Sequence, residues 1–240
     1  MRNWILPAVA AVAGGVGVWG YDRFAAPGGA EQVRIERIVH NYVLTHPEIV
    51  SDAMHRLQDR DTAAAIAANR AAITAPVGDA WAGNAKGDVT VVEYYDYNCG
   101  YCRASLPIID QLVASDPNVR VVFRDLPILA PSSGVAAQMS IAAARAGRFK
   151  PFHDALYAAG PVTDATIAAS ARKAGLDPAT LNRDAQSPAV VDTVRANLAT
   201  QRALGLTGTP SFVIGNRLLT GAQPLADLQA AIADARKRGA

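Results

Sequence analysis

The two cysteines of this sequence, Cys99 and Cys102, stand three positions apart, directly after a run of β-branched and aromatic residues at 89–97. Such a run predicts a buried strand, and the cysteine pair then opens a helix. Helix-terminal N–H groups favour an anion, so the first sulfur can be a thiolate near neutral pH. The second sulfur is close enough to attack a disulfide that the first one forms. We therefore predict a redox-active pair at a strand–helix junction.

A structural staple and a zinc half-site are the alternative interpretations of the pair. A disulfide that closes so short a loop stabilises a fold by only about 2 kcal/mol, against about 5 kcal/mol for a loop of about 100 residues. Zinc usually takes four ligands, and the sequence has no second cysteine pair to complete the set. We therefore expect redox chemistry, with no metal site and no cofactor.

The composition indicates a folded domain with additional elements. Half of the 240 residues are hydrophobic and 18% are charged, which excludes wholesale disorder. The formal net charge of +2 indicates no particular class of partner. Because the sequence has no basic stripe with interleaved aromatic residues, we expect no nucleic-acid binding.

The N-terminus contains one long uncharged stretch. After Arg2 the next charge is Asp22, and residues 4–20 are apolar or small throughout. This length is near the lower limit for crossing a bilayer and exceeds that of most signal-peptide cores. We predict that residues 1–26 are a signal anchor or a cleaved signal peptide. Both alternatives place the rest of the chain outside the cytoplasm, either tethered to the inner membrane or soluble.

Residues 27–75 have the pattern of a separate helical segment. Apolar residues recur at helical spacing on both sides of Thr45, and Pro47 suits the first turn of a second helix. Such helices cannot bury their apolar stripes alone, so residues 30–75 pack either on the main domain or on copies of themselves. Arg60 interrupts the heptad spacing, and we expect no long coiled coil.

After a loop over residues 75–87, the main domain, residues 76–240, alternates strands with helices. Two strands flank one helix, and a long alanine-rich helical stretch follows at about residues 130–204. Two short strands joined by a tight turn then precede the last helix. The expected elements are strand 89–95, helix 99–114, strand 119–123, strands 210–214 and 217–219, and a helix from Pro224.

Four segments carry a resemblance to a known family. They are residues 93–103, which include Cys-Gly-Tyr-Cys, and residues 123–129, 152–156 and 208–212. With the order of elements, they resemble an α/β thioredoxin-like fold with an inserted helical domain, in the DsbA-like family of bacterial periplasmic thiol–disulfide proteins. The version found in the suppressor-of-copper-sensitivity protein C subgroup is the most similar. Several proteins of that subgroup also have an N-terminal helical oligomerisation segment.

The resemblance implies a role for each matched residue. Cys99 is the expected nucleophile, and Cys102 is the expected buried resolving thiol. Pro210 matches a cis-proline that faces the sulfurs, and the backbone at Thr209 pairs with a bound peptide like an added strand. Glu93 matches a buried acidic position, from which a carboxyl can take the proton of Cys102. An ion pair between Glu93 and an arginine is the alternative.

Other residues near the pair have less specific expectations. Gly100 and Tyr101, between the cysteines, are expected to contact the substrate, with simple packing of Tyr101 as an equal alternative. We expect Asp96 to be a solvated loop carboxylate rather than a group that tunes the site. We also expect His153, like the other histidines, to have an ordinary surface or packing role.

These inferences predict protein thiol–disulfide exchange in the bacterial periplasm. The Gly-Tyr dipeptide and Thr209 resemble the pattern of isomerases, so we favour disulfide isomerisation or reduction over DsbA-type oxidation. The expected partners are protein substrates with disulfides or thiols, a membrane redox partner that resets the pair, and other copies of the chain. A Cu(I)-binding envelope protein is the alternative from another class, since two thiolates suit Cu(I).

Overall fold

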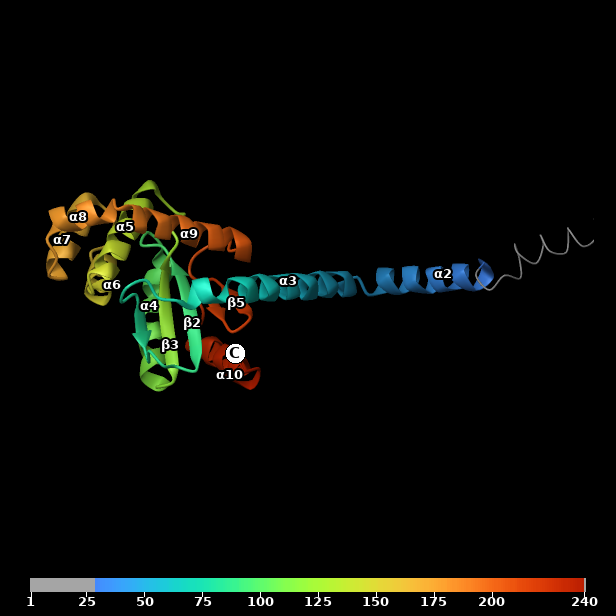
Figure 1. Ribbon diagram of the computed structural model, residues 1–240. Coiled ribbons are helices and arrows are strands. Elements are labelled where there is room, and N and C mark those ends of the chain that lie inside the picture. Colours follow the sequence, from blue (N-terminus) through green and yellow to red (C-terminus); the bar gives the residue numbers. More distant parts are fainter. Residues whose placement is uncertain (1–28, 240) are drawn as a thin grey trace, which may run out of the picture. The chain divides into compact units, whose positions relative to one another are not determined.

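The computed structural model describes residues 29–239 (Figure 1). Residues 1–26, with the predicted anchor or signal peptide, lie outside this range. The chain divides after Gln58 into two compact units, which are described in turn. Within the described range, no helix has both the length and the apolar character that crossing a bilayer requires.

The first unit contains α2 (Gly29–Thr45) and the beginning of α3 (Glu48–Thr74). The two helices are separated at His46 and Pro47, where the sequence predicts that a helix restarts. No residue of α2 is buried. The large apolar side chains that α2 leaves exposed are Val33, Ile35, Ile38, Val39, Tyr42 and Leu44.

The second unit is built on a five-stranded sheet with the strand order β1-β3-β2-β4-β5. β2 and β3 pair in parallel, whereas the other neighbouring pairs are antiparallel. The almost continuous run of β-formers in β2 suits its place at the centre of the sheet, where both faces are covered. The strands are β1 (Trp81–Gly83), β2 (Val89–Tyr95), β3 (Val119–Asp125), β4 (Ser211–Ile214) and β5 (Arg217–Thr220).

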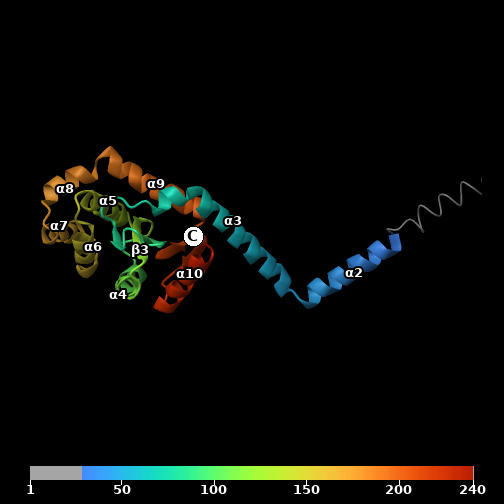
Figure 2. The ribbon, with the colours of Figure 1, turned by 60° about the horizontal axis from the view of Figure 1, so that its bottom comes forward.

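The remaining helices of this unit fall into two groups. α4 (Gly100–Ser115) and α10 (Leu225–Lys237) pack on each other and on the strands. The helices α5 to α9 form a group of their own, inserted in the chain between β3 and β4 (Figures 1 and 2). Gly205, with a left-handed φ of 66°, ends this group. Its members are α5 (Pro131–Arg145), α6 (Phe149–Ala158), α7 (Asp164–Lys173), α8 (Pro178–Ala185) and α9 (Pro188–Leu204).

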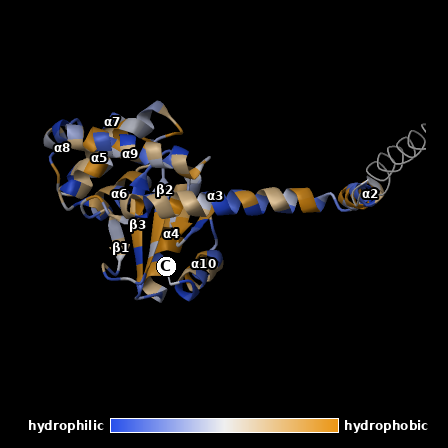
Figure 3. Cartoon of the chain, turned by 45° about the vertical axis from the view of Figure 1, so that its right-hand side comes forward, coloured by the Kyte–Doolittle hydropathy of each residue, from blue (hydrophilic) through white to orange (hydrophobic). Residues whose placement is uncertain are grey.

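Two apolar clusters cover the two faces of the sheet. On one face, Tyr95 of β2 lies beside Asp125 of β3 and packs with side chains of α4, α5 and α6. On the opposite face, Tyr94 packs in a second cluster with Ile66 and Ile73 of α3. β3 and α4 are largely hydrophobic, whereas hydrophobic and hydrophilic residues alternate along α3 (Figure 3). Burial of each large apolar side chain contributes about 2 kcal/mol to stability.

Two features of the second unit differ from the expectations. The sequence predicts a loop over residues 75–87, but β1 lies there and pairs with β3. Three residues are too few to show the period of a strand. The sequence also predicts a domain boundary at residue 75, whereas the compact units divide at residue 58. Residues 59–74 belong to the second unit because Ile66 and Ile73 are buried in its core.

Candidate active site

The cysteine pair lies where β2 turns into α4. Cys99 is the N-cap of α4, with an extended backbone, and its sulfur accepts a hydrogen bond from the backbone N–H of Cys102 at 3.3 Å. The positive end of the helix dipole therefore points at this sulfur and favours a thiolate there. The prediction that the pair stands at a strand–helix junction is confirmed.

The two sulfurs differ in burial. Cys99 keeps 5% of its surface exposed, whereas Cys102 keeps only 1%, and both are free thiols. Burial, the largest cause, raises the pKa of the Cys102 thiol well above its ordinary value, and the charge of Glu93 raises it further. Cys102 is therefore a protonated thiol at neutral pH, and it needs a proton acceptor before it can attack a disulfide.

The segment around Pro210 reaches the pair from the far end of the chain. The peptide bond between Thr209 and Pro210 is cis, as the resemblance implies. The carbonyl oxygen of Thr209 accepts a hydrogen bond from the thiol of Cys99 at 3.2 Å. Thr209 is half-buried, and its buried Oγ1 atom has no hydrogen-bond partner among the described residues. The structure thus brings Thr209 and Pro210 against the first sulfur, across 110 positions of sequence.

Glu93 lies in β2 on the same face of the sheet as Tyr95, six positions before Cys99. It is 2% exposed, and burial raises its pKa to about 8. Among residues 29–239, no lysine or arginine nitrogen lies within ion-pair distance of its carboxylate, so the alternative of an ion pair with arginine is not observed. A carboxyl of this pKa exchanges its proton in the range in which thiols react.

Gly100 and Tyr101 form the first turn of α4 between the two cysteines. The Tyr101 side chain is 72% exposed, so it does not pack into the domain core. A Cβ added to Gly100 would meet no atom within 4 Å. Both positions therefore face solvent beside the sulfur of Cys99.

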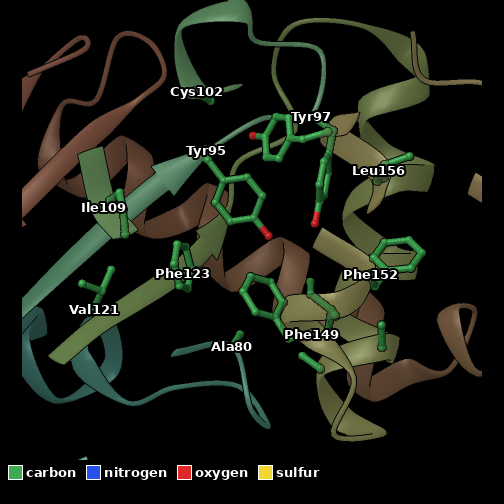
Figure 4. Close-up of a cluster of buried hydrophobic side chains, with 14 of the residues drawn as sticks. Ala80, Tyr95, Tyr97, Cys102, Ile109, Val121, Phe123, Phe149, Phe152 and Leu156 are labelled. Carbon is green, nitrogen blue, oxygen red and sulfur yellow. The ribbon is translucent and has the colours of Figure 1, made fainter. Parts of the chain in front are cut away.

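A cluster of aromatic and polar side chains lies beneath the pair. The rings of Tyr95 and Tyr97 lie between Cys102 and the phenylalanines of α6 (Figure 4). The Tyr97 hydroxyl lies 3.0 Å from His153 Nδ1 and 3.0 Å from Ser140 Oγ. Burial lowers the pKa of His153 to about 3, so this histidine is neutral and has a packing role, as expected.

Asp96 is the residue for which the sequence-based expectation is wrong. Instead of a solvated carboxylate, it is 2% exposed and accepts hydrogen bonds from Asn98, Ile128, Leu129 and Ser133. Three of these donors lie 32 to 37 positions away, so no local pattern could show them. The one sequence signal is its place between the strand and the cysteines.

No group of three or more His, Cys, Asp or Glu residues that could hold a metal ion is present within the part of the chain described here. The two thiols are the soft ligands that this site offers. The arrangement is instead suited to thiol–disulfide exchange, with one sulfur at a helix terminus, a second buried behind it and a carboxyl beneath them.

Comparisons with known families agree with this chemistry. The model of the DSBA-like thioredoxin domain matches residues 90–233, which contain the cysteine pair, Glu93 and the Thr209–Pro210 segment. The model of the copper resistance protein ScsC N-terminal domain matches residues 31–64. The resemblance to the DsbA-like family and its suppressor-of-copper-sensitivity subgroup is therefore confirmed.

Individual relatives are similar to parts of the chain. A thioredoxin-like oxidoreductase from Silicibacter pomeroyi is 42% identical, with a TM-score of 0.64, over 65% of this chain and 91% of that one. The thiol-disulfide exchange protein alpha-DsbA2 from Wolbachia pipientis is 27% identical, with a TM-score of 0.66, over 74% and 97%. The Na(+)/H(+) antiporter NhaA of Herminiimonas arsenicoxydans is 34% identical over 63% of this chain.

The chain spans only 24% of the length of that antiporter, so the match concerns one part of a much longer protein. The DSBA-like family model, in contrast, covers more than half of this chain and the whole of the site. This protein therefore belongs to the family of DSBA-like thioredoxin domains.

Proposed function

We propose that this protein exchanges disulfides with other proteins in the bacterial periplasm and favours isomerisation or reduction over oxidation. The observation that carries the proposal is the position of the Cys99 sulfur. It lies 3.3 Å from the Cys102 N–H at the start of α4 and 3.2 Å from the Thr209 carbonyl oxygen. A sulfur so placed can ionise and meet a client chain that aligns with the Thr209 backbone.

The exchange has two steps. The Cys99 thiolate attacks a client disulfide, forms a mixed disulfide and releases the other client sulfur as a thiolate. Cys102 then attacks the Cys99 sulfur, releases the client as a dithiol and leaves an intramolecular disulfide. In isomerisation, a second client thiolate attacks the mixed disulfide instead, and the enzyme returns with both cysteines reduced.

Glu93 is the proposed acceptor of the Cys102 proton. The buried Cys102 thiol needs such an acceptor before it can attack, and the charge of Glu93 adds to the burial that raises the pKa of this thiol. With a pKa of about 8, the Glu93 carboxyl is ionised in part of the molecules near neutral pH and in most of them above pH 8. It can therefore accept the proton and later return it.

The Thr209 carbonyl is the proposed docking point for the client backbone. While Cys99 is protonated, this oxygen accepts its S–H. Once Cys99 forms a mixed disulfide, the thiol proton is gone and this oxygen is free to accept a client N–H. The hydrogen bond between the client and the Thr209 carbonyl and the mixed disulfide at Cys99 then stabilise each other. Tyr101 and Gly100 face solvent at the same sulfur and would contact the client.

The redox partner and the assembly that we propose are inferred from the family and from the sequence pattern of the N-terminal helices. We propose that a membrane redox partner resets the pair and that residues 30–75 hold several copies of the chain together. Several active sites in one assembly favour isomerisation, since a wrong disulfide can be opened and its released sulfurs captured nearby.

Single-cysteine variants test this function. With insulin as the client, Cys102→Ala should accumulate a mixed disulfide that is visible on a non-reducing gel, because the resolving sulfur is missing. Cys99→Ala, the matched control, should form none. If neither variant traps insulin, the exchange mechanism is wrong. The rate at which the wild type restores activity to ribonuclease with scrambled disulfides, compared with its oxidation of reduced ribonuclease, then tests the preferred direction.

A further inference from the structure

Asp96 is the buried carboxylate closest in sequence to the redox pair, directly after β2 and three positions before Cys99. Its Oδ1 accepts hydrogen bonds from the Asn98 N–H at 2.9 Å and from the Ser133 hydroxyl at 2.7 Å. Its Oδ2 accepts from the N–H groups of Ile128 and Leu129 at 2.9 and 3.0 Å. All four neighbours donate and none accepts, which is the environment of an ionised carboxylate.

These bonds tie the redox loop to two other segments of the domain. Ser133 lies in the first turn of α5 and also accepts a hydrogen bond from the Asn98 side chain at 2.9 Å. The backbone carbonyl of Asp96 accepts from the Cys99 N–H at 2.9 Å and from the Tyr157 hydroxyl of α6 at 3.0 Å. Asp96 is thus the junction between the cysteine loop, the loop after β3 and the inserted helices.

The junction places a buried carboxylate on the turn that leads into Cys99, and the backbone carbonyl of the same residue accepts the Cys99 N–H. The positive end of α4 favours a Cys99 thiolate, and a carboxylate on the adjoining turn opposes it. A thiolate carries a charge that a disulfide lacks, so the carboxylate destabilises the reduced pair relative to the oxidised pair. The field of Asp96 therefore makes the pair a weaker oxidant.

We propose that Asp96 is a positioning residue that holds Cys99 at the start of α4 and, through its charge, sets the reduction potential of the Cys99–Cys102 pair on the reducing side. The inference rests on the proposed function, because it explains why this site favours isomerisation or reduction. The titratable and charged groups near the pair and near Asp96 include Glu93 of β2, Asp125 of β3, Arg103 next to Cys102 in α4 and Tyr157 of α6, and the test leaves them unchanged.

Asp96→Asn removes the charge and keeps the size of the side chain. The equilibrium of the pair with reduced and oxidised glutathione should shift about tenfold toward the dithiol, which is about 30 mV toward a stronger oxidant. Alkylation of Cys99 by iodoacetamide should also reach its half-maximal rate at lower pH. Asp154→Asn, at an exposed carboxyl of α6, is the matched control and should shift neither quantity.

Ser133→Ala provides a second test that does not depend on folding of the first variant. It removes one donor to Asp96 and keeps the charge, so the less neutralised carboxylate should act more strongly on Cys99. The glutathione equilibrium should then shift about twofold in the opposite direction, toward the disulfide. If Asp96→Asn loses stability while its equilibrium and alkylation profile match the wild type, Asp96 is only structural and the proposal is wrong.

If Asp96→Asn and Ser133→Ala shift the glutathione equilibrium in the same direction, the proposal is also wrong. The proposed function fails by a different observation, the absence of a trapped client in Cys102→Ala. The glutathione equilibrium needs no protein client, so the two failures can be told apart.

Discussion

Burial, rather than a charged partner, governs the protonation of Glu93. Its carboxyl faces the interior on β2, and its pKa is raised to about 8 because the ionised form loses its hydration. Below pH 8 the carboxyl is mostly protonated and cannot take another proton. As the pH rises through 8, the carboxylate forms and becomes an acceptor. The step in which Cys102 releases the client should therefore become faster over this range.

Glu93→Gln should abolish the increase in the client-release rate with pH. It should also slow client release by about 100-fold, the usual size of a general-base contribution. The measurement is the release of insulin from its mixed disulfide with Cys99, between pH 6 and pH 9. Asp125→Asn is a matched control, because burial also raises the pKa of this neighbouring carboxyl to about 8. In the Asp125→Asn control the release rate should still increase with pH. If the release rate of Glu93→Gln also increases with pH, proton transfer through Glu93 is excluded.

Single residues also show what could be predicted of the site. Cys99, Cys102 and Glu93 stand in one short segment, and their positions relative to the strand are enough to predict their chemical roles. The approach of Thr209 to the sulfur came only from the resemblance, since a contact across 110 positions leaves no local pattern. Asp96 was misjudged because three of its four donors come from Ile128, Leu129 and Ser133, which no periodicity connects to it.

Among the secondary-structure elements, α3 is held at its C-terminal end by a buried arginine of β3. Arg124 of β3 is 7% exposed and donates to the carbonyl oxygens of Ala72, Ile73 and Ala75. It also donates to the side chain of Asn197 in α9. A cation at a helix C-terminus is favoured by the dipole, and here it satisfies carbonyls that the helix itself leaves unpaired. Arg124 thus fastens α3 to the sheet.

Arg124→Met should destabilise the second unit by about 3 kcal/mol, because the buried carbonyl of Ile73, the buried Asn197 side chain and two partly buried carbonyls lose their donor at once. Urea unfolding measures the change. Arg217→Met is the control, since this exposed arginine pairs with Asp234 at 3.8 Å, its one ionic partner within residues 29–239, and this pair should contribute at most about 1 kcal/mol. Equal losses in the two variants would mean that Arg124 does not anchor α3.

The turn before β1 depends on a glycine. Gly78 has a φ of 55°, and a Cβ there would lie 2.1 Å from the carbonyl oxygen of Ala144 in α5. Gly78→Ala should therefore cost more than Gly221→Ala, where φ is 83° but the space around a Cβ is open. The control should lose about 1 kcal/mol from backbone strain alone. The urea midpoints compare the two, and equal values would show that the α5 contact is not rigid.

Across the whole molecule, the long elements follow from the sequence. The two N-terminal helices, the inserted helices and the final hairpin have either strong periodicity or clear turn residues, and the structure contains them. The boundary at residue 58 could not be predicted, because it depends on which turns of one continuous helix find a partner. Ile66 and Ile73 find one in the sheet, and the alanine-rich pattern around them gives no sign of it.

The apolar side chains of α2 carry a prediction about assembly. Ile35, Ile38, Val39 and Tyr42 are all more than half exposed. If residues 30–75 hold copies together, Val39→Asp should turn an oligomer into a monomer in sedimentation equilibrium of the full chain. The rate at which the variant isomerises scrambled ribonuclease should fall, whereas its rate of insulin reduction should stay unchanged because the active site is intact. Arg37→Asp, on the opposite face of α2, should change none of these, and a wild-type monomer would contradict the assembly.

The place of the inserted helices has a consequence for biosynthesis. β4 is the neighbour of β2 in the sheet, yet it follows the insertion in the chain. A nascent chain therefore displays both thiols while more than a hundred residues, including the segment that covers the first sulfur, are still to be made. Until the Thr209–Pro210 segment has been made, the Cys99 sulfur lacks the carbonyl that accepts its thiol proton, and an oxidant can reach both sulfurs. Synthesis of the segment around Thr209 and Pro210 therefore completes the surroundings of the first sulfur.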